Sequence, residues 1–241
     1  YNTDNFAAAG AGTVIDSLYA IKKAVYEDKI TTFGHLLKAM KEDFRDDEIL
    51  RQYLLHKVPK FCKDKDATEF GKKVMDDLAE CLGGQANYRG GKFEPSLFAF
   101  YSYNWFKNVT IATADGRKSE SALSRGVNPS ESTENINIAA LLDAIKTMDY
   151  TKYPGGAVIY MDIPLMYKTP QPSLFASVMR AFCENGGSIM DFNVISRNAL
   201  LEAQKNPETH KNIVVRVCGY SAYFHTLTAE MQNEVIQRTQ R

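Results

Sequence analysis

The sequence has no excess charge of either sign and no long apolar run. Its 241 residues carry 29 lysines and arginines against 29 aspartates and glutamates. Nucleic-acid-binding domains usually show a basic patch, and a membrane helix needs about 20 consecutive apolar residues. We therefore expect no nucleic-acid partner and no membrane span. The N-terminus lacks a charged segment followed by an apolar one and starts with Tyr1, not Met, so we expect the chain to be a fragment.

Metal-binding and nucleotide-binding motifs are also absent. The four cysteines are widely spread, with no Cys-x-x-Cys pair and no histidine at ligand spacing, so the sequence predicts no metal site. The glycine pairs Gly83-Gly84 and Gly90-Gly91 lack the context of phosphate-binding loops. A chain of this length buries a core without disulfides, which favours reduced thiols and a cytoplasmic location. The residues weighed here are Cys62, Cys81, Cys183 and Cys218, with His35, His56, His210 and His225.

Helical spacing dominates the first third of the chain. Apolar residues over 16–43 predict two amphipathic helices joined near Asp28-Lys29, the second capped by Thr31 or Thr32. A further helix is predicted over 67–81. The aromatic-rich stretch 97–106 then suggests a buried strand.

Strands and helices alternate in the second half, after a long irregular connection over 113–137. Loops of that length inside compact domains are usually functional. The pattern indicates α/β architecture. The predicted elements are helices over 138–148, 174–184, 199–205 and 229–240, the last capped by Thr228, and strands over 157–163, 188–194 and 213–217.

Gly219 follows the last predicted strand and opens the loop Tyr-Ser-Ala-Tyr-Phe. Most glycines at a strand end serve only to turn the chain, because they tolerate unusual backbone angles. The residues around Gly219 favour a second interpretation. The run Arg216-Val217-Cys218-Gly219-Tyr220, with Phe224 and Leu227 beyond it, resembles the C-terminal signature of the glycyl radical enzyme family, which includes pyruvate formate-lyase and the glycerol and choline dehydratases and lyases.

The resemblance extends over essentially the whole chain. Asp16-Ser17-Leu18 is similar to a helix of the family, and Ala112-Thr113-Ala114-Asp115-Gly116-Arg117 to its Ala-Thr-Pro-Asp-Gly-Arg loop. Asn193-Val194 and the run 203–208 precede the radical motif as they do in the family. The resemblance implies an incomplete pyruvate formate-lyase-like domain over 1–112 and a glycine radical domain over 113–241. The implied fold is the C-terminal part of a ten-stranded α/β barrel with flanking helices.

The same resemblance implies a mechanism and its partners. The radical is stored on Gly219, passed to a cysteine thiol, and used to take hydrogen from a small-molecule substrate. Turnover needs no bound organic cofactor, but an activating enzyme with S-adenosylmethionine and an iron–sulfur cluster installs the radical. The enzyme is expected to belong to anaerobic metabolism, because the radical is oxygen-sensitive, and to form a homodimer when complete.

The site residues implied by the resemblance lie in two loops. Gly219 carries the radical, and Asp115, Gly116 and Arg117 are candidates for the pocket loop. Arg216 is expected to pair with a carboxylate or with carbonyls, and apolar neighbours, Tyr223 among them, to exclude solvent from the radical. The supporting residues of the radical loop are Arg216, Val217, Cys218, Tyr220, Ser221 and Phe224.

Two departures from the family pattern qualify the function. Ala114 stands where the family has proline, and none of the four cysteines lies in the family's Gly-Cys loop, so Cys218 is assigned no catalytic role. The favoured function is a radical dehydratase or lyase completed by a cysteine-bearing chain or segment. The alternatives are a formate acetyltransferase-like enzyme, a non-catalytic radical carrier or repair subunit, and a degenerate member that never forms the radical.

Overall fold

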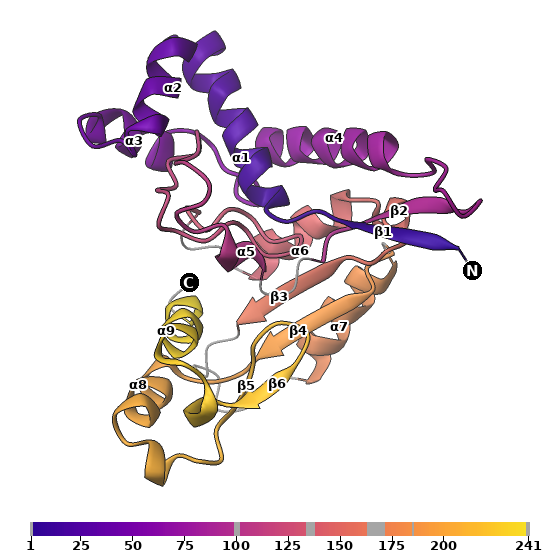
Figure 1. Ribbon diagram of the computed structural model, residues 1–241, viewed down its shortest axis with the longest axis vertical. Helices are drawn as coiled ribbons and strands as arrows, with labels where there is room; N and C mark the ends of the chain where they lie inside the picture. Colours follow the sequence, from indigo (N-terminus) through magenta and orange to yellow (C-terminus); the bar gives the residue numbers. More distant parts are fainter. Residues whose placement is uncertain (1, 99–101, 134–137, 163–171, 185, 240–241) are drawn as a thin grey trace.

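The computed structural model describes residues 2–98, 102–133, 138–162, 172–184 and 186–239 (Figure 1). Four helices, α1 to α4, occupy one end of the molecule, and the C-terminal elements α8, α9, β5 and β6 lie toward the other, with β3 and β4 between them. No helix among the described residues is long and apolar enough to cross a membrane.

The two helices predicted over 16–43 are present. Helix α1 spans Ala11–Ile21 and continues as a π-helical segment, Lys22–Glu27, before α2, Phe33–Lys41. The hydroxyl of Thr32 caps α2 by accepting a hydrogen bond from the His35 N–H at 3.2 Å. Thr32 is one of the two residues predicted as alternatives for this cap. Helix α4, Lys65–Leu82, agrees with the helix predicted over 67–81, whereas α3, Glu48–His56, was not predicted.

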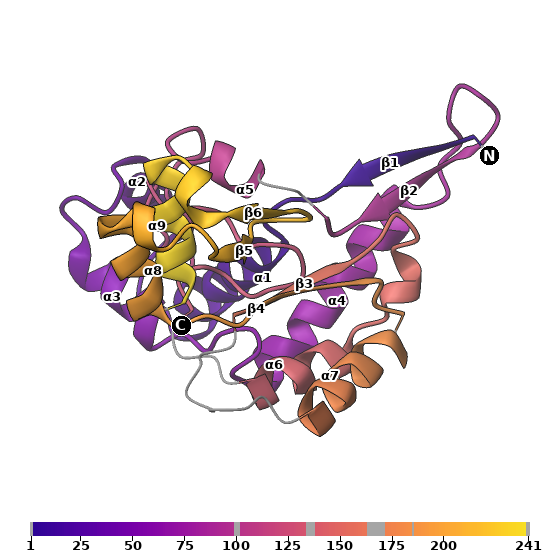
Figure 2. The ribbon, with the colours of Figure 1, turned by 90° about the horizontal axis from the view of Figure 1, so that it is seen from below.

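The described strands form three two-stranded sheets. Strand β1, Thr3–Ala7, pairs in parallel with β2, Lys92–Ser96, and β3, Val158–Asp162, pairs in parallel with β4, Ile189–Asn193. A single bridge between Leu97 and Ala157 links the two pairs. Figure 2 shows β1 and β2 as an arm that projects from the rest of the molecule.

Strand β3 separates two hydrophobic cores because its side chains alternate between the two faces of the sheet. Ile159 and Met161 belong to the core shared with α1, α4, α6 and α7, whereas Val158 and Tyr160 face the core formed with α8, α9 and the last strands. The C-terminal helices are α6, Ile138–Thr147, α7, Pro172–Glu184, α8, Arg197–Lys205, and α9, Ala229–Arg238.

The strand predicted over 97–106 is wrong in type for its described second half. Residues Ser102–Trp105 form the short helix α5, and the strand of this region is β2, which ends at Ser96. A short apolar run fits a buried helix as well as a buried strand, so periodicity could not distinguish them. Residues 99–101 of that prediction lie outside the described residues. Strand β1 was not predicted, because only the distant β2 gives it a partner.

The resemblance implies that this chain supplies only the C-terminal part of the barrel. The described strands form three pairs, two of them linked by the bridge between Leu97 and Ala157, and they do not close into a ring. The helices and strands predicted after residue 137 are present, and their described ends lie within two residues of the predicted ones. The predicted cap of α9 is also present, because the Thr228 hydroxyl accepts the Met231 N–H at 3.3 Å.

Candidate radical site

Gly219 lies at the tip of a tight hairpin. Strand β5, Val214–Arg216, pairs antiparallel with β6, Ser221–Tyr223, and the Val217 N–H donates to the Tyr220 carbonyl at 2.9 Å. This register leaves only Cys218 and Gly219 to turn the chain. Gly219 has φ of +74°, a left-handed conformation that glycine adopts without steric cost. The predicted open loop after Gly219 is therefore partly wrong, since its residues return as a strand.

The hairpin buries some of the predicted supporting residues and exposes others. Val217, Cys218 and Phe224 are fully buried, but Gly219 is exposed, and Tyr220 and Tyr223 are 47% and 53% exposed. Ser221 is exposed as well. The two tyrosines therefore do not provide the expected shielding of Gly219 among the residues that the structure describes.

The predicted carboxylate partner of Arg216 is Asp191 of β4. The Arg216 Nε donates to Asp191 Oδ1 at 2.9 Å, and the Gly219 N–H donates to the other carboxylate oxygen, Oδ2, at 3.0 Å. Asn193, two residues further along β4, accepts the Arg216 N–H at 2.7 Å and donates to the Arg216 carbonyl at 2.9 Å. Two side chains of β4 therefore fix the backbone of β5 and the turn.

The Asp115-Gly116-Arg117 loop lies against α1 and α3, from which Ser17 donates to Asp115 and Arg51 donates to the Gly116 carbonyl. Asp115 is completely buried and accepts hydrogen bonds from the hydroxyls of Ser17, Thr113, Ser130 and Ser132. Burial opposes its ionisation, but the positive charge of Lys60 and these hydroxyls outweigh it and hold the pKa of Asp115 below its usual value. Asp115 therefore links Thr113 of its own loop to Ser130 and Ser132 through hydrogen bonds.

A second buried carboxylate, Asp16 of α1, accompanies Asp115. It accepts from the Phe61 N–H at 2.7 Å, the Ser130 N–H at 3.3 Å and the Thr133 hydroxyl at 3.0 Å. Burial raises the pKa of Asp16 to about 6 despite the nearby charge of Lys60. Sequence reasoning named Asp16 only as part of a family-like helix and did not find this cluster.

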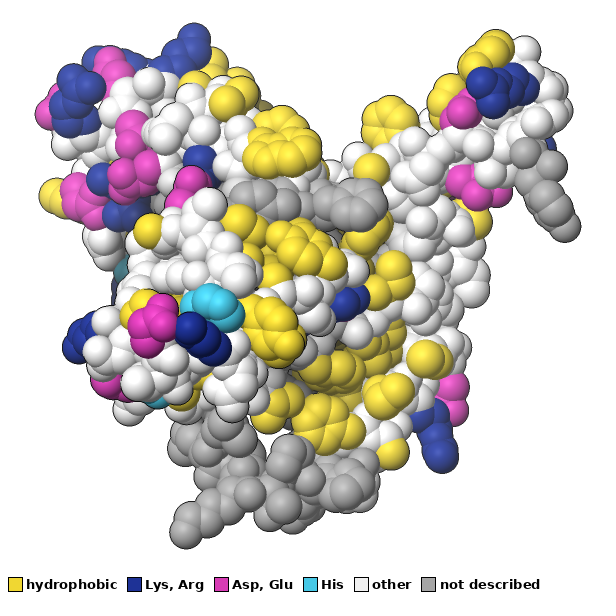
Figure 3. Space-filling view, turned by 60° about the horizontal axis from the view of Figure 1, so that its bottom comes forward, with side chains coloured by type: hydrophobic (Ala, Val, Ile, Leu, Met, Phe, Trp, Pro, Cys, Tyr) yellow, Lys and Arg dark blue, Asp and Glu magenta, His cyan; other side chains and the backbone are white. Residues whose placement is uncertain are grey.

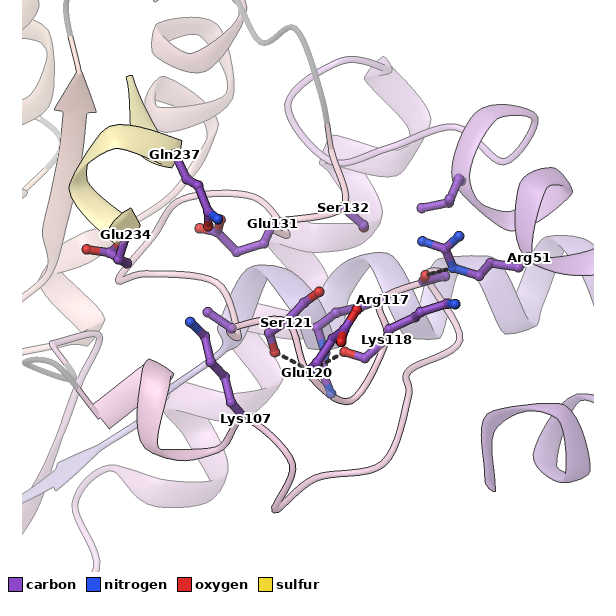
Figure 4. A pocket seen from close by; sticks show the side chains of 13 residues that line it. Arg51, Lys107, Arg117, Lys118, Glu120, Ser121, Glu131, Ser132, Glu234 and Gln237 are labelled. Carbon is purple, nitrogen blue, oxygen red and sulfur yellow. Dashed lines mark hydrogen bonds between the residues drawn. The ribbon is translucent and has the colours of Figure 1, made fainter. Parts of the chain in front are cut away.

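Gly116 and Arg117 line a pocket of about 430 Å³ (Figure 4). Arg51 of α3 and Lys118 line one side of this pocket, and Glu234 and Gln237 of α9 line the opposite side. This pocket therefore brings the 115–117 loop together with α9, and Gly219 is not part of its described lining.

The Arg117 guanidinium is used inside the loop itself. It donates to the Thr113 and Thr110 hydroxyls and to three carbonyls, those of Lys118, Ser121 and Ile111, at 2.6 to 3.2 Å. These five bonds hold the pocket wall in place and use all five N–H groups of the guanidinium, so none is left for a ligand.

Metal and disulfide chemistry have no support among the described residues. No group of three or more histidine, cysteine, aspartate or glutamate side chains in that part of the chain has the arrangement of a metal site. No disulfide joins the four cysteines; Cys62 and Cys218 are buried and Cys81 and Cys183 exposed. Burial raises the pKa of the Cys62 thiol well above its usual value, so it is unsuited to act as a thiolate.

Two family models match the chain. Residues 1–107 match the pyruvate formate lyase-like model, and residues 123–225, which include the hairpin, match the glycine radical model. The chain belongs to the glycyl radical enzyme family.

Characterised relatives match it from end to end. The chain is 30% identical over 244 residues to trans-4-hydroxy-L-proline dehydratase of Clostridioides difficile, covering 100% of this chain and 31% of the relative. It is 34% identical over 243 residues to isethionate sulfite-lyase of Nitratidesulfovibrio vulgaris, covering 99% and 29%. The chain thus spans about three tenths of the length of these relatives.

Solved structures agree in fold. The C. difficile hydroxyproline dehydratase with trans-4-hydroxy-L-proline bound superposes with a TM-score of 0.89 at 30% identity, covering 100% of this chain and 31% of that one. The glycerol-bound B12-independent glycerol dehydratase of Clostridium butyricum also gives 0.89, at 31% identity, covering 98% and 30%. Glycyl radical enzymes have a ten-stranded α/β barrel, and this chain matches part of it.

Sequence reasoning missed Asp191 as a residue of the radical site. The signal was available in the predicted strand 188–194, where Asp191 and Asn193 place two polar side chains on one face of a mostly apolar strand. A buried polar pair of this kind needs partners, and the hairpin supplies them.

Proposed function

We propose that this chain stores a radical on the α-carbon of Gly219 and that it serves a radical dehydratase or lyase acting on a small substrate. The observation that carries the proposal is the backbone of Gly219, which sits without a side chain at the exposed tip of a hairpin inside the region that matches the glycine radical model. Dehydratases and lyases among the relatives support the reaction class.

Glycine suits a stored radical for two physical reasons. A radical at the α-carbon becomes planar and is delocalised over the preceding amide nitrogen and the following carbonyl, and no Cβ opposes this planarity. The missing Cβ also permits close approach of another group. In the proposed sequence, the radical takes a hydrogen atom from a cysteine thiol, the resulting thiyl takes one from the substrate, and the hydrogen returns after the substrate has reacted.

The proposal assigns the remaining roles as follows. Residues 1–112 are the C-terminal part of the pyruvate formate-lyase-like domain and 113–241 the glycine radical domain. A radical S-adenosylmethionine enzyme with an iron–sulfur cluster is the activating partner. The thiol comes from outside this chain, because none of its four cysteines stands in a Gly-Cys loop. The cysteine-bearing segment that supplies this thiol then covers the hairpin face that is exposed among the described residues.

Anaerobic activation followed by exposure to air tests the proposal. The chain is treated with a glycyl radical activase, S-adenosylmethionine and reductant, then exposed to oxygen, and its intact mass is measured. Oxygen is expected to cleave the chain at Gly219. An uncut chain, when a family member is cut in parallel by the same activase and by a second one, would contradict radical storage. Substrate turnover only with an added cysteine-bearing segment distinguishes an enzyme from a carrier.

A further inference from the structure

Asp191 lies in the middle of β4 on the face turned toward the hairpin. Ile189 on the same face contributes to the core beneath α8 and α9, while Met190 and Phe192 pack on the opposite side of the sheet. The carboxylate is therefore surrounded by protein, and Asp191 is 5% exposed. A charged group so deeply buried is stable only with close partners.

The two partners of Asp191 among the described residues come from the radical hairpin. One carboxylate oxygen accepts the Arg216 Nε and the other accepts the Gly219 N–H, at 2.9 and 3.0 Å. The side chain of Arg216 is 32% exposed, whereas that of Asp191 is 3% exposed, so solvent reaches the guanidinium but hardly the carboxylate of this ion pair. The amide next to the proposed radical carbon thus donates to a buried anion.

We infer that Asp191 is a positioning residue for the Gly219 radical, acting through the Gly219 amide; this rests on the proposed function. The radical is stabilised by electron density from the amide nitrogen. A carboxylate that accepts the N–H draws the proton toward itself and increases the electron density on that nitrogen, and a charged acceptor does so more strongly than a neutral one. The same bond fixes the plane of the amide.

Arg216 and Asn193 keep this carboxylate aimed at Gly219. The Arg216 guanidinium donates to Oδ1 of Asp191, so Oδ2 remains available to the Gly219 N–H. The Asn193 side-chain amide accepts from the Arg216 N–H and donates to the Arg216 carbonyl, which fixes this part of β5. An asparagine at 191 would present one oxygen and one NH₂ group to two donors, so at least one of the two bonds would be lost.

The Asp191→Asn variant tests this inference, with Asp143→Asn as the matched control. Asp143 undergoes the same chemical change on α6, where its side chain is 81% exposed and its nearest cation, Lys146, is 4.0 Å away. Three quantities are measured: hydrogen exchange of the Gly219 amide, the electron paramagnetic resonance spectrum of the radical after anaerobic activation, and the lifetime of that radical.

We expect Gly219 amide exchange to become about tenfold faster in Asp191→Asn, as for loss of one charge-assisted hydrogen bond. The hyperfine splitting should change and the radical should decay about tenfold faster, while Asp143→Asn behaves as the unaltered chain. A merely structural role would leave the splitting of any radical that forms unchanged, and that result would overturn the inference.

Two measurements on the unaltered chain protect the test from a misfolded variant. If the Gly219 amide exchanges within about threefold of the rate of an unstructured peptide, the bond to Asp191 is not formed and the inference is wrong. If the unaltered chain forms no radical, the proposed function and this inference fall together. A normal radical in both the unaltered chain and Asp191→Asn overturns the inference alone.

Discussion

Gly219 and Gly84 share a left-handed backbone, with φ of +74° and +75°. Their described surroundings are similarly permissive: a Cβ on Gly84 would meet no described atom within 4 Å, and one on Gly219 would meet Phe98 at 3.4 Å, an ordinary van der Waals contact. The two glycines therefore have matching backbone conformations and similar space for a Cβ, and the proposed radical is assigned to Gly219 alone.

This match separates the backbone cost of Gly219 from its proposed function. We expect Gly219→Ala and Gly84→Ala each to lower the free energy of unfolding by about 1 kcal/mol, the cost of a left-handed alanine. Only Gly219→Ala should abolish the radical signal and the cleavage by oxygen. Thermal unfolding and intact mass measure the two effects. Cleavage that persists in Gly219→Ala would place the radical on another residue.

Asp16 gives the chain a pH dependence opposite to that of a stabilising ion pair. Its pKa is about 6 in the folded chain and 3.8 as the ordinary value, so the folded state holds the proton more tightly. The contribution of Asp16 to stability is full below about pH 4 and is lost as the pH rises through about 6.

The Asp16→Asn variant should reveal this dependence by comparison. Asparagine cannot ionise, so the stability difference between the unaltered chain and the variant should shrink by about 1 kcal/mol between pH 5 and 7. Denaturant unfolding at a series of pH values measures it, with Asp143→Asn as an exposed control. A difference that stays constant with pH would show that Asp16 ionises as in the unfolded chain.

At the scale of elements, the loop over 110–121 depends on one guanidinium. The five hydrogen bonds of Arg117 all end within this loop, and its side chain is 2% exposed. The resemblance to the family drew attention to Arg117 as a pocket residue. The structure adds that its donors are engaged in holding the pocket wall.

Replacing Arg117 by lysine should therefore loosen the loop although the charge is kept. A lysine has a single nitrogen and cannot reach five acceptors, so we expect a loss of about 3 kcal/mol in the free energy of unfolding. Arg51→Lys is the matched control, because Arg51 donates to the same loop only through the Gly116 carbonyl. It should cost about 1 kcal/mol, and equal losses in both variants would contradict the argument.

Local patterns made some elements predictable and left others hidden. The Thr32 and Thr228 caps and the helix α4 follow from residues within a few positions of each other. Strand β1 and the bond between Asp191 and Gly219 depend on residues about 90 and 28 positions apart, which periodicity does not register. For the same reason the motif identified Gly219, whereas the carboxylate that holds its amide appeared only in the structure.

At the scale of the whole molecule, apolar side chains gather in the middle of one face, between the C-terminal helices and the β1–β2 arm (Figure 3). Among the described residues the parallel pair β3–β4 has no further strand beyond the single bridge to Leu97, although parallel sheets normally have neighbours and cover on both sides. On the hairpin, the paired residues Val214 and Tyr223 are each 53% exposed. Exposed apolar surface next to open strand edges favours association with another chain.

We therefore expect the isolated chain to associate as its concentration rises. Sedimentation velocity between roughly 1 and 100 µM should show an increasing apparent mass, and Tyr223→Lys should weaken the association about tenfold by placing a charge on the apolar face. Ile49→Lys is the control, because Ile49 is 90% exposed on α3, among the N-terminal helices. An unaltered chain that remains a monodisperse monomer throughout this range would contradict the prediction. Equal weakening by both variants would locate the association away from the hairpin.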